Sequence, residues 1–193
     1  PHIEKIPYFD VDEFEKVYAC VLFHDELDIL KFRMDNLNHH VDYFVIVEST
    51  HTHSGKEKPL YFQELSHLFS EYDDKIVSVV IDGFPPAPED QDEHWFRENY
   101  QRNMIKKVVS SMQPRDKDLI MISDVDEIPD RDRLNNIFYQ LKVEKRKYGT
   151  CRQRWFHWNY DWTEIEDWPG TQVTTWDYLK NVEPQDMRNS RFD

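Results

Sequence analysis

Short apolar runs rich in β-branched and aromatic residues recur along the chain and predict buried strands. These runs span residues 17–23, 43–47, 76–81 and 119–122. Continuous apolar runs are typical of strands that are covered on both faces, as in parallel sheets. A strand-like run with large aromatic residues covers 148–158, and residues 172–176 are a candidate for a short last strand.

Helical periodicity appears between these runs. Leu27, Leu30, Met34, Leu37 and Val41 recur at helical spacing, and Asp25 is the predicted N-cap. A long helix is predicted over 93–112, and shorter ones over 63–74 and from residue 134 to about 147. The alternation of strand, helix and strand predicts an α/β fold with a mostly parallel central sheet flanked by helices.

The remaining segments are polar and predict loops. Residues 1–16 are expected to form a terminal arm, and residues 50–62 a polar loop. Residues 82–93 contain three prolines, and residues 159–171 are acidic and rich in Trp, so both are predicted as loops. A chain of 193 residues suits a single domain, which we expect to span 1–193.

Charge narrows the classes of partner. The chain has 38 Asp and Glu against 24 Lys and Arg, a formal charge of −14. This balance argues against a nucleic-acid or anionic-membrane binder, which needs a basic face. A phosphate-bearing ligand stays possible, because a bound divalent cation reverses the local sign of charge. The chain contains no run of about 18 apolar residues, so the sequence predicts no membrane span.

Glycine and cysteine usage excludes some sites. Only four glycines occur, so no glycine-rich phosphate-binding loop is available. Cys20 and Cys151 are interpreted as two buried free thiols, with one disulfide as the alternative. His51 and His53 lie in a polar loop without a third ligand, which is weak support for zinc.

The segment DLIMISDVDEIPD at residues 118–130 carries the clearest chemistry. Alternation along an extended chain points Asp124 and Asp126 to the same side, directly after a buried strand. Two carboxylates in this position suit Mg²⁺ or Mn²⁺, and the cation could neutralise a diphosphate leaving group. The alternative interpretation is a solvated turn or a helix cap.

Asp124 and Asp126 are expected at the edge of the sheet where the parallel strands have their carboxyl ends, which is where ligands bind in such folds. Polar residues that directly follow the other strands are expected at this edge too. His24, Asp25 and Glu26 follow the first strand and Glu48 follows the second. His24, Asp25 and Glu48 could bind the ribose or base of a nucleotide. Arg102 on the long helix could bind phosphate, or could form only a surface salt bridge.

Several segments together resemble glycosyltransferase family 17. They are residues 21–37, residues 41–62, GFPP at 83–86 and SDVDEIPD at 123–130, with a weaker likeness through WPGT at 168–171. The resemblance implies a GT-A-like nucleotide-diphospho-sugar transferase fold. It also implies inverting transfer of a sugar, GlcNAc, from a UDP-sugar to a glycan hydroxyl, with Mn²⁺ or Mg²⁺ as cofactor.

The resemblance also assigns roles to residues. Asp124 and Asp126 match the DxD motif, with Asp126 the more direct metal ligand and Asp124 nearer the ribose and the metal. Nucleotide contacts fall on His24, Asp25, Glu26, Glu48 and an Arg102–Asn103 pair. Members related to this chain continue past the position of Asp193, so a C-terminal contact to metal or diphosphate could be missing.

An inverting mechanism needs a carboxylate base for the acceptor hydroxyl. Glu164, Glu166 and Asp167 are candidates in the Trp-rich segment, and Asp167 is our choice. The alternative is a solvated acidic loop.

Two other functions are weighed against this one. A haloacid-dehalogenase-like phosphatase also uses an Asp-x-Asp motif, but expects it after the first strand. A non-catalytic relative that only binds sugar or nucleotide is the other alternative. Since the sequence shows no stem, anchor or rich cysteine content, we expect a bacterial or viral relative in the cytoplasm rather than a Golgi enzyme.

Overall fold

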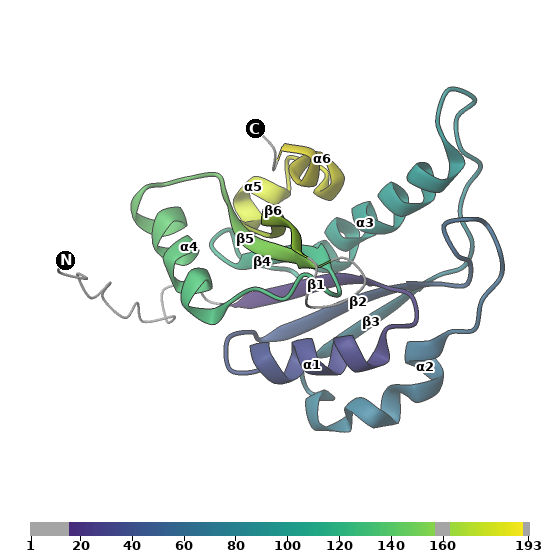
Figure 1. Ribbon diagram of the computed structural model, residues 1–193, viewed down its shortest axis with the longest axis horizontal. Helices are drawn as coiled ribbons and strands as arrows, with labels where there is room; N and C mark the ends of the chain where they lie inside the picture. Colours follow the sequence, from purple (N-terminus) through teal and green to yellow (C-terminus); the bar gives the residue numbers. More distant parts are fainter. Residues whose placement is uncertain (1–15, 157–162, 191–193) are drawn as a thin grey trace.

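A six-stranded sheet with helices on both faces forms the molecule (Figure 1). The computed structural model describes residues 16–156 and 163–190. The first half contains β1 (Val17–Phe23), α1 (Leu27–Leu37), β2 (Tyr43–Ser49), α2 (Tyr61–Leu65), the 3₁₀ helix η2 (Ser66–Tyr72) and β3 (Ile76–Ile81). The second half contains α3 (Glu93–Ser111), β4 (Leu119–Asp124), α4 (Arg131–Val143), β5 (Tyr148–Phe156), β6 (Thr163–Thr175), α5 (Trp176–Leu179) and α6 (Pro184–Asn189).

The parallel part of the sheet confirms the predicted α/β architecture. The strand order is β3-β2-β1-β4-β6-β5, and β1 to β4 run parallel. In the register of these strands Phe23 lies beside Glu48, and Leu22 lies beside Asp124. Strands β1, β2 and β4 therefore end at one edge, where their following loops meet.

The last two strands correct the sequence-based expectation. Residues 163–171 were predicted as part of a loop, but they belong to β6, which runs antiparallel to both β4 and β5. The pairing of β5 with β6 shifts register between Thr150 and Arg152 and again after Gln153. Such irregularities let the strand accommodate Pro169, which has no N–H to donate. Residues 157–162 lie outside the described part of the chain.

Alternate residues of the strands face two separate apolar layers. One layer packs Val21, Ile46 and Met121 against α1, α2, η2 and α4. The other packs Cys20, Val45 and Ile122 against α3, α5 and α6. The sheet is thus covered on both sides, which explains why its parallel strands are continuously apolar.

Local details of two helices differ from the prediction. The N-cap of α1 is Glu26 rather than Asp25, and no side chain caps this helix. Instead, Glu26 Oε2 accepts hydrogen bonds from the backbone N–H groups of His24 and Asp25, at 3.1 Å each. The helix predicted over 63–74 begins at Tyr61 and continues as η2.

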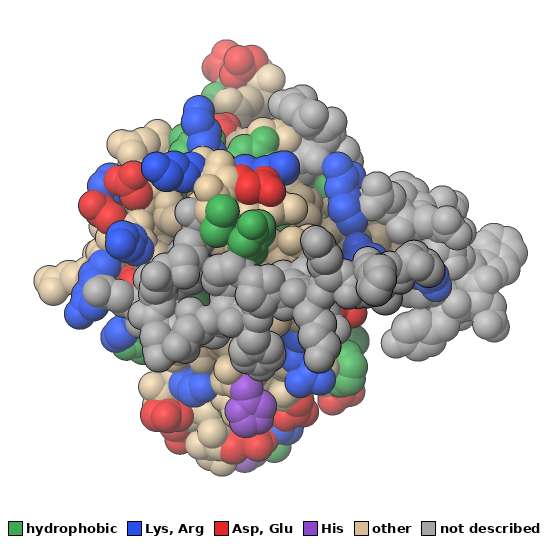
Figure 2. Space-filling model, turned by 90° about the vertical axis from the view of Figure 1, so that its left-hand side faces the viewer, with side chains coloured by type: hydrophobic (Ala, Val, Ile, Leu, Met, Phe, Trp, Pro, Cys, Tyr) green, Lys and Arg blue, Asp and Glu red, His purple; other side chains and the backbone are tan. Residues whose placement is uncertain are grey.

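The surface mixes both signs of charge. On the face shown in Figure 2, Lys and Arg side chains of the described residues alternate with Asp and Glu. None of the helices in residues 16–156 and 163–190 has the length and apolar character needed to cross a membrane.

Candidate active site

A pocket of about 760 Å³ opens at the edge where β1, β2 and β4 end. The end of β1, the loop after β2, one side of α3 and the end of β4 line it. Five of the residues singled out from the sequence are in its wall: His24, Glu26, Arg102, Asp124 and Asp126. The structure thus brings Asp124 and Asp126 together with the polar end of β1.

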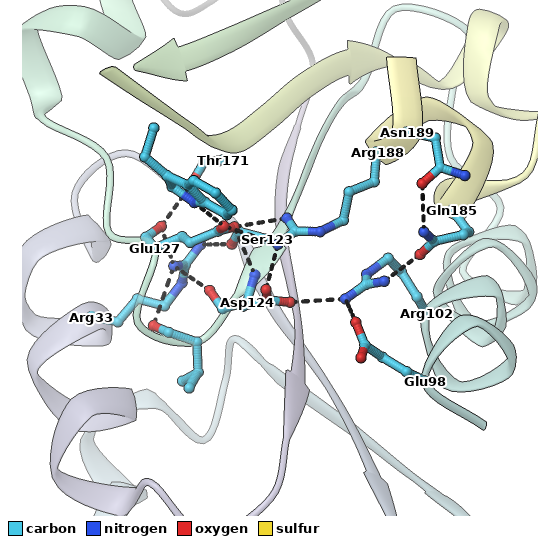
Figure 3. A network of polar contacts seen from close by, with 12 residues as sticks. Arg33, Glu98, Arg102, Ser123, Asp124, Glu127, Thr171, Gln185, Arg188 and Asn189 are labelled. Atoms are coloured by element: carbon cyan, nitrogen blue, oxygen red, sulfur yellow. Dashed lines mark hydrogen bonds and ion pairs between the residues drawn. The ribbon is translucent and has the colours of Figure 1, made fainter. Parts of the chain in front are cut away.

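Asp124 is held between two arginines (Figure 3). Arg102 of α3 donates from Nη2 to Asp124 Oδ1 at 3.0 Å, and Arg188 of α6 donates from Nη2 to Asp124 Oδ2. Arg102 also pairs with Glu98 Oε1 at 2.8 Å and contacts Gln185. Because Arg102 is only 1% exposed, the alternative of a surface salt bridge is wrong.

Glu127 links the turn after β4 to three other segments of the chain. Its carboxylate accepts from Arg188, from Trp168 Nε1 at 2.8 Å and from the backbone N–H of Asp124 at 3.1 Å. Its backbone oxygen accepts from Arg33 Nη1 at 2.8 Å and from Thr171 Oγ1 at 2.6 Å. The turn that carries Asp124 and Asp126 is therefore fixed by α1, β6 and α6 together (Figure 3).

Arg33 is a second fully buried arginine of this network, as buried as Arg102. It is 1% exposed, and its Nη2 donates to Ser123 Oγ at 2.6 Å. Burial lowers the pKa of Arg33 to about 10, although the nearby charge of Glu127 opposes this shift. The guanidinium remains charged at neutral pH and offsets part of the acidic charge around the turn.

Asp126 differs from Asp124 and Glu127 because, among the residues that the structure describes, no Lys or Arg forms an ion pair with it. Within the described residues its carboxylate makes no ion pair and no hydrogen bond to another residue. Partial desolvation raises its pKa, and the negative charges of Asp124 and Glu127 raise it further. Surplus negative charge at a pocket wall is an environment that a cation would relieve.

The acids fit an open divalent-cation site. In residues 16–156 and 163–190, no three His, Cys, Asp or Glu side chains are grouped as a closed metal cage. Mg²⁺ is usually held by one or two carboxylates, with water and substrate phosphates as the other ligands. Asp126, assisted by the partly neutralised Asp124, matches that donor set, and the pocket leaves room for a diphosphate.

Glu48, Asn103 and Asp25, which were also singled out from the sequence, are not among the residues that line the pocket. Glu48 is 1% exposed, and its Oε1 accepts from Lys58 Nζ at 2.9 Å. Asn103 Oδ1 accepts from the backbone N–H of Gln185 at 3.0 Å and so joins α3 to α6. Asp25 is exposed in the loop before α1. Asp167 lies in β6, and its side chain is outside what the structure describes.

Sequence reasoning missed several residues of the site. Arg188, Arg33 and Glu127 form the network that fixes Asp124; Glu127 belongs to the acidic segment recognised in the sequence but was given no role, and no local pattern marks the two arginines. His51, His53, His94 and Gln101 line the pocket on the side of β2 and α3. The sequence analysis weighed His51 and His53 only as weak zinc candidates, although they follow a strand as His24 does, and that position was a usable signal.

Comparisons with known proteins agree with this architecture. The sequence profile described as Glycosyltransferase family 17 matches residues 8–148. The β-1,4-mannosyl-glycoprotein 4-β-N-acetylglucosaminyltransferases of Rattus norvegicus and Homo sapiens are each 32% identical to this chain over 121 residues. The match covers 61% of this chain but only 22% of each relative, so the chain spans about a fifth of their length.

Two solved structures share the fold. The mannosyltransferase PcManGT from Pyrobaculum calidifontis, in complex with GDP-Man and Mn²⁺, superimposes with a TM-score of 0.55 at 13% identity, covering 86% of this chain and 46% of that one. A 4-diphosphocytidyl-2C-methyl-D-erythritol synthase gives 0.53 at 12% identity, covering 91% and 84%. These likenesses confirm the predicted GT-A-like fold.

Proposed function

Because the chain belongs to glycosyltransferase family 17, we propose that it transfers GlcNAc from UDP-GlcNAc to a glycan hydroxyl, with inversion and with Mn²⁺ or Mg²⁺ as cofactor. The relatives named above are N-acetylglucosaminyltransferases for a mannosyl glycoprotein, and one structural neighbour holds a nucleotide sugar with Mn²⁺. The observation that carries the proposal is Asp126, a carboxylate with no ion pair to any described residue, beside the arginine-paired Asp124 in a pocket at the carboxyl edge of the sheet.

The two acids have different tasks in this proposal. Asp126 is the principal cation ligand, and Asp124 is kept in a fixed position by Arg102 and Arg188. When bound, the cation would stabilise the charge that develops on the leaving diphosphate. His24 and Glu26, which line the pocket beside β1, are proposed to contact the nucleotide.

The acceptor side needs a base. We assign this role to Asp167, which would take the proton from the acceptor hydroxyl as its oxygen bonds to the anomeric carbon and the bond to the diphosphate breaks. Asp167→Asn should lower kcat by about 100-fold or more while UDP still binds. Weaker UDP binding with an unchanged kcat would contradict the assignment.

Calorimetric titration of UDP with and without Mn²⁺ tests the donor site. We expect Mn²⁺-dependent binding to the wild-type protein, and loss of that dependence in Asp126→Asn. Asp74→Asn is a matched control, because Asp74 is exposed and lies outside the pocket wall. UDP binding that is absent, or that is the same without metal, would overturn the proposal.

A donor screen tests the transferred sugar. The protein is incubated with Mn²⁺, a mannose-rich N-glycan and a series of UDP-sugars, and the linkage of any product is analysed. Transfer of GlcNAc is the expected result. Transfer of another sugar would keep the transferase function and overturn the donor assignment.

A further inference from the structure

A hydrogen-bonded chain crosses the pocket wall that faces β2. Gln101 Nε2 donates to the backbone oxygen of Val47 at 2.7 Å. Gln101 Oε1 lies 2.8 Å from His53 Nε2. Gln101 is 3% exposed, so its amide is held at both ends inside the protein, whereas His53 is in the pocket wall.

This chain fixes which nitrogen of His53 carries a proton. A backbone carbonyl only accepts hydrogen bonds, so the Gln101 amide nitrogen must face Val47. The amide oxygen then faces His53, and an amide oxygen also only accepts. The proton of the His53–Gln101 hydrogen bond therefore belongs to His53 Nε2.

The imidazole of His53 is neutral in this setting. Burial lowers the pKa of His53, and the nearby His94 and Arg102 lower it too, whereas Gln101 and Glu98 act in the opposite direction. A neutral imidazole with its proton on Nε2 keeps an unprotonated lone pair on Nδ1. Within the described residues, Nδ1 has no hydrogen-bond partner.

The position of His53 along the sheet indicates which part of a ligand it meets. Strand β1 lies between β2 and β4, so the loop after β2 and the acids after β4 flank it. Two strand spacings separate these ends by about 10 Å. Since the proposed diphosphate site is at Asp126, the nucleoside would reach toward the loop after β2.

Two neighbouring rings pack against His53. The His53 ring meets the rings of His94 and Phe84 edge to face, with centroids 5.6 Å and 6.3 Å away. These contacts, together with the bond to Gln101, hold the imidazole in one orientation. The acceptor on Nδ1 is thus presented by a rigid group, which is what discrimination between similar ligands needs.

We infer that His53 Nδ1 is a fixed hydrogen-bond acceptor that selects the nucleobase, favouring uracil over cytosine, and that Gln101 sets its polarity. This inference rests on the proposed function. Uracil has an N–H group at N3, which can donate to Nδ1. Cytosine has a lone pair at N3, which would face the lone pair of Nδ1 and leave two buried acceptors unpaired.

Calorimetric titration of UDP and CDP in the presence of Mn²⁺ tests the inference. The wild-type protein should bind UDP about 10- to 100-fold more tightly than CDP, the usual effect of one buried mismatched polar contact. His53→Ala should reduce that ratio to within about threefold by weakening UDP binding. His67→Ala is the matched control: His67 is exposed and does not line the pocket, so its loss should preserve the ratio.

A second variant tests the polarity itself. In Gln101→Glu the carboxylate favours the doubly protonated imidazole, which turns Nδ1 into a donor. The preference for UDP should then fall at acidic pH and return as the pH rises. In case this buried substitution unfolds the chain, the tautomer is read directly in the wild-type protein from a long-range ¹H–¹⁵N NMR spectrum, with the proton expected on Nε2.

The outcomes separate the inference from the function on which it rests. Mn²⁺-dependent UDP binding with the same UDP-to-CDP ratio in His53→Ala would overturn the inference alone. A proton on Nδ1 in the NMR spectrum would also overturn it. If neither nucleotide binds, the proposed function fails and the inference fails with it.

Discussion

Arg188 and Glu127 form a bidentate ion pair inside the molecule, with Nη1–Oε2 and Nη2–Oε1 distances of 2.8 Å and 2.9 Å. The two residues are 61 positions apart in the sequence. Both are less than 8% exposed, so the pair is largely shielded from solvent. It attaches helix α6 to the turn after β4 and thereby supports the acids of the candidate active site.

Removing the cation of this pair should cost much stability. Arg188→Met removes the cation of the buried pair with Glu127, and breaking a buried ion pair by removing one partner typically costs about 3–5 kcal/mol. The free energy of unfolding, measured in urea, should fall by that amount.

The control is a solvent-exposed ion pair. Lys106→Met removes the 2.9 Å contact with Glu183, which should cost less than about 1 kcal/mol. Equal losses in the two variants would show that the Arg188 pair is not specially stabilising.

The buried pair of Lys58 and Glu48 should show strong coupling. Their side chains are 5% and 1% exposed and lie 2.9 Å apart. Lys58→Met alone should destabilise the protein by about 3–5 kcal/mol, because it strands the Glu48 carboxylate. The double variant with Glu48→Gln should recover a large part of this loss in the same unfolding experiment. Additive losses would contradict a direct interaction.

Asp126 should limit stability at neutral pH. Its pKa is raised in the folded state, so the folded protein favours the protonated form. The protonated Asp126 side chain therefore gives its full contribution to the free energy of unfolding below the unfolded-state pKa. This contribution is lost as the pH rises through the folded-state pKa. Asp126→Asn should melt at a higher temperature than wild type at pH 7, and this gain should vanish in acid.

The wild-type protein and Asp126→Asn can also be compared for their response to Mn²⁺. Mn²⁺ should raise the melting temperature of wild type, because binding to the folded state alone stabilises it. The variant should respond less. A melting temperature of Asp126→Asn that equals wild type at neutral pH, in the absence of metal, would contradict the electrostatic argument.

The two cysteines should be unreactive in the folded protein. Cys20 and Cys151 are free and buried. Burial raises the pKa of both thiols, that of Cys151 to about 12, so little reactive thiolate exists at neutral pH. Alkylation by iodoacetamide, followed by mass spectrometry, should require unfolding conditions. Rapid labelling of either cysteine in buffer would show that its side chain becomes accessible.

Much of the parallel sheet was predictable because its signals are local. The apolar runs that became β1, β2, β3 and β4 are continuous, and helical periodicity separates the first two. The placement of Asp124 and Asp126 at the carboxyl edge followed from the same pattern. Buried free thiols at Cys20 and Cys151 were also predicted and are confirmed.

The remaining features depend on contacts between distant segments. Residues 163–171 carry acids, a proline and a glycine, which disguise the strand β6 as a loop until β4 and β5 supply its partners. The partners of Glu127 come from positions 33, 168, 171 and 188, and no local period connects them. Glu48 was chosen as a nucleotide ligand because it follows the second strand. Its buried ion pair with Lys58 could be identified only from the fold.

The pairing of Arg188 with Asp124 also imposes an order on assembly during synthesis. The ribosome completes β4 before it adds the 64 residues that lead to Arg188. A nascent chain can therefore stack its parallel strands early, since domains fold as their segments emerge. The acidic end of β4 must wait, hydrated and incompletely neutralised, until α6 arrives. The wall of the pocket at Asp124 is thus completed late, after most of the sheet already exists.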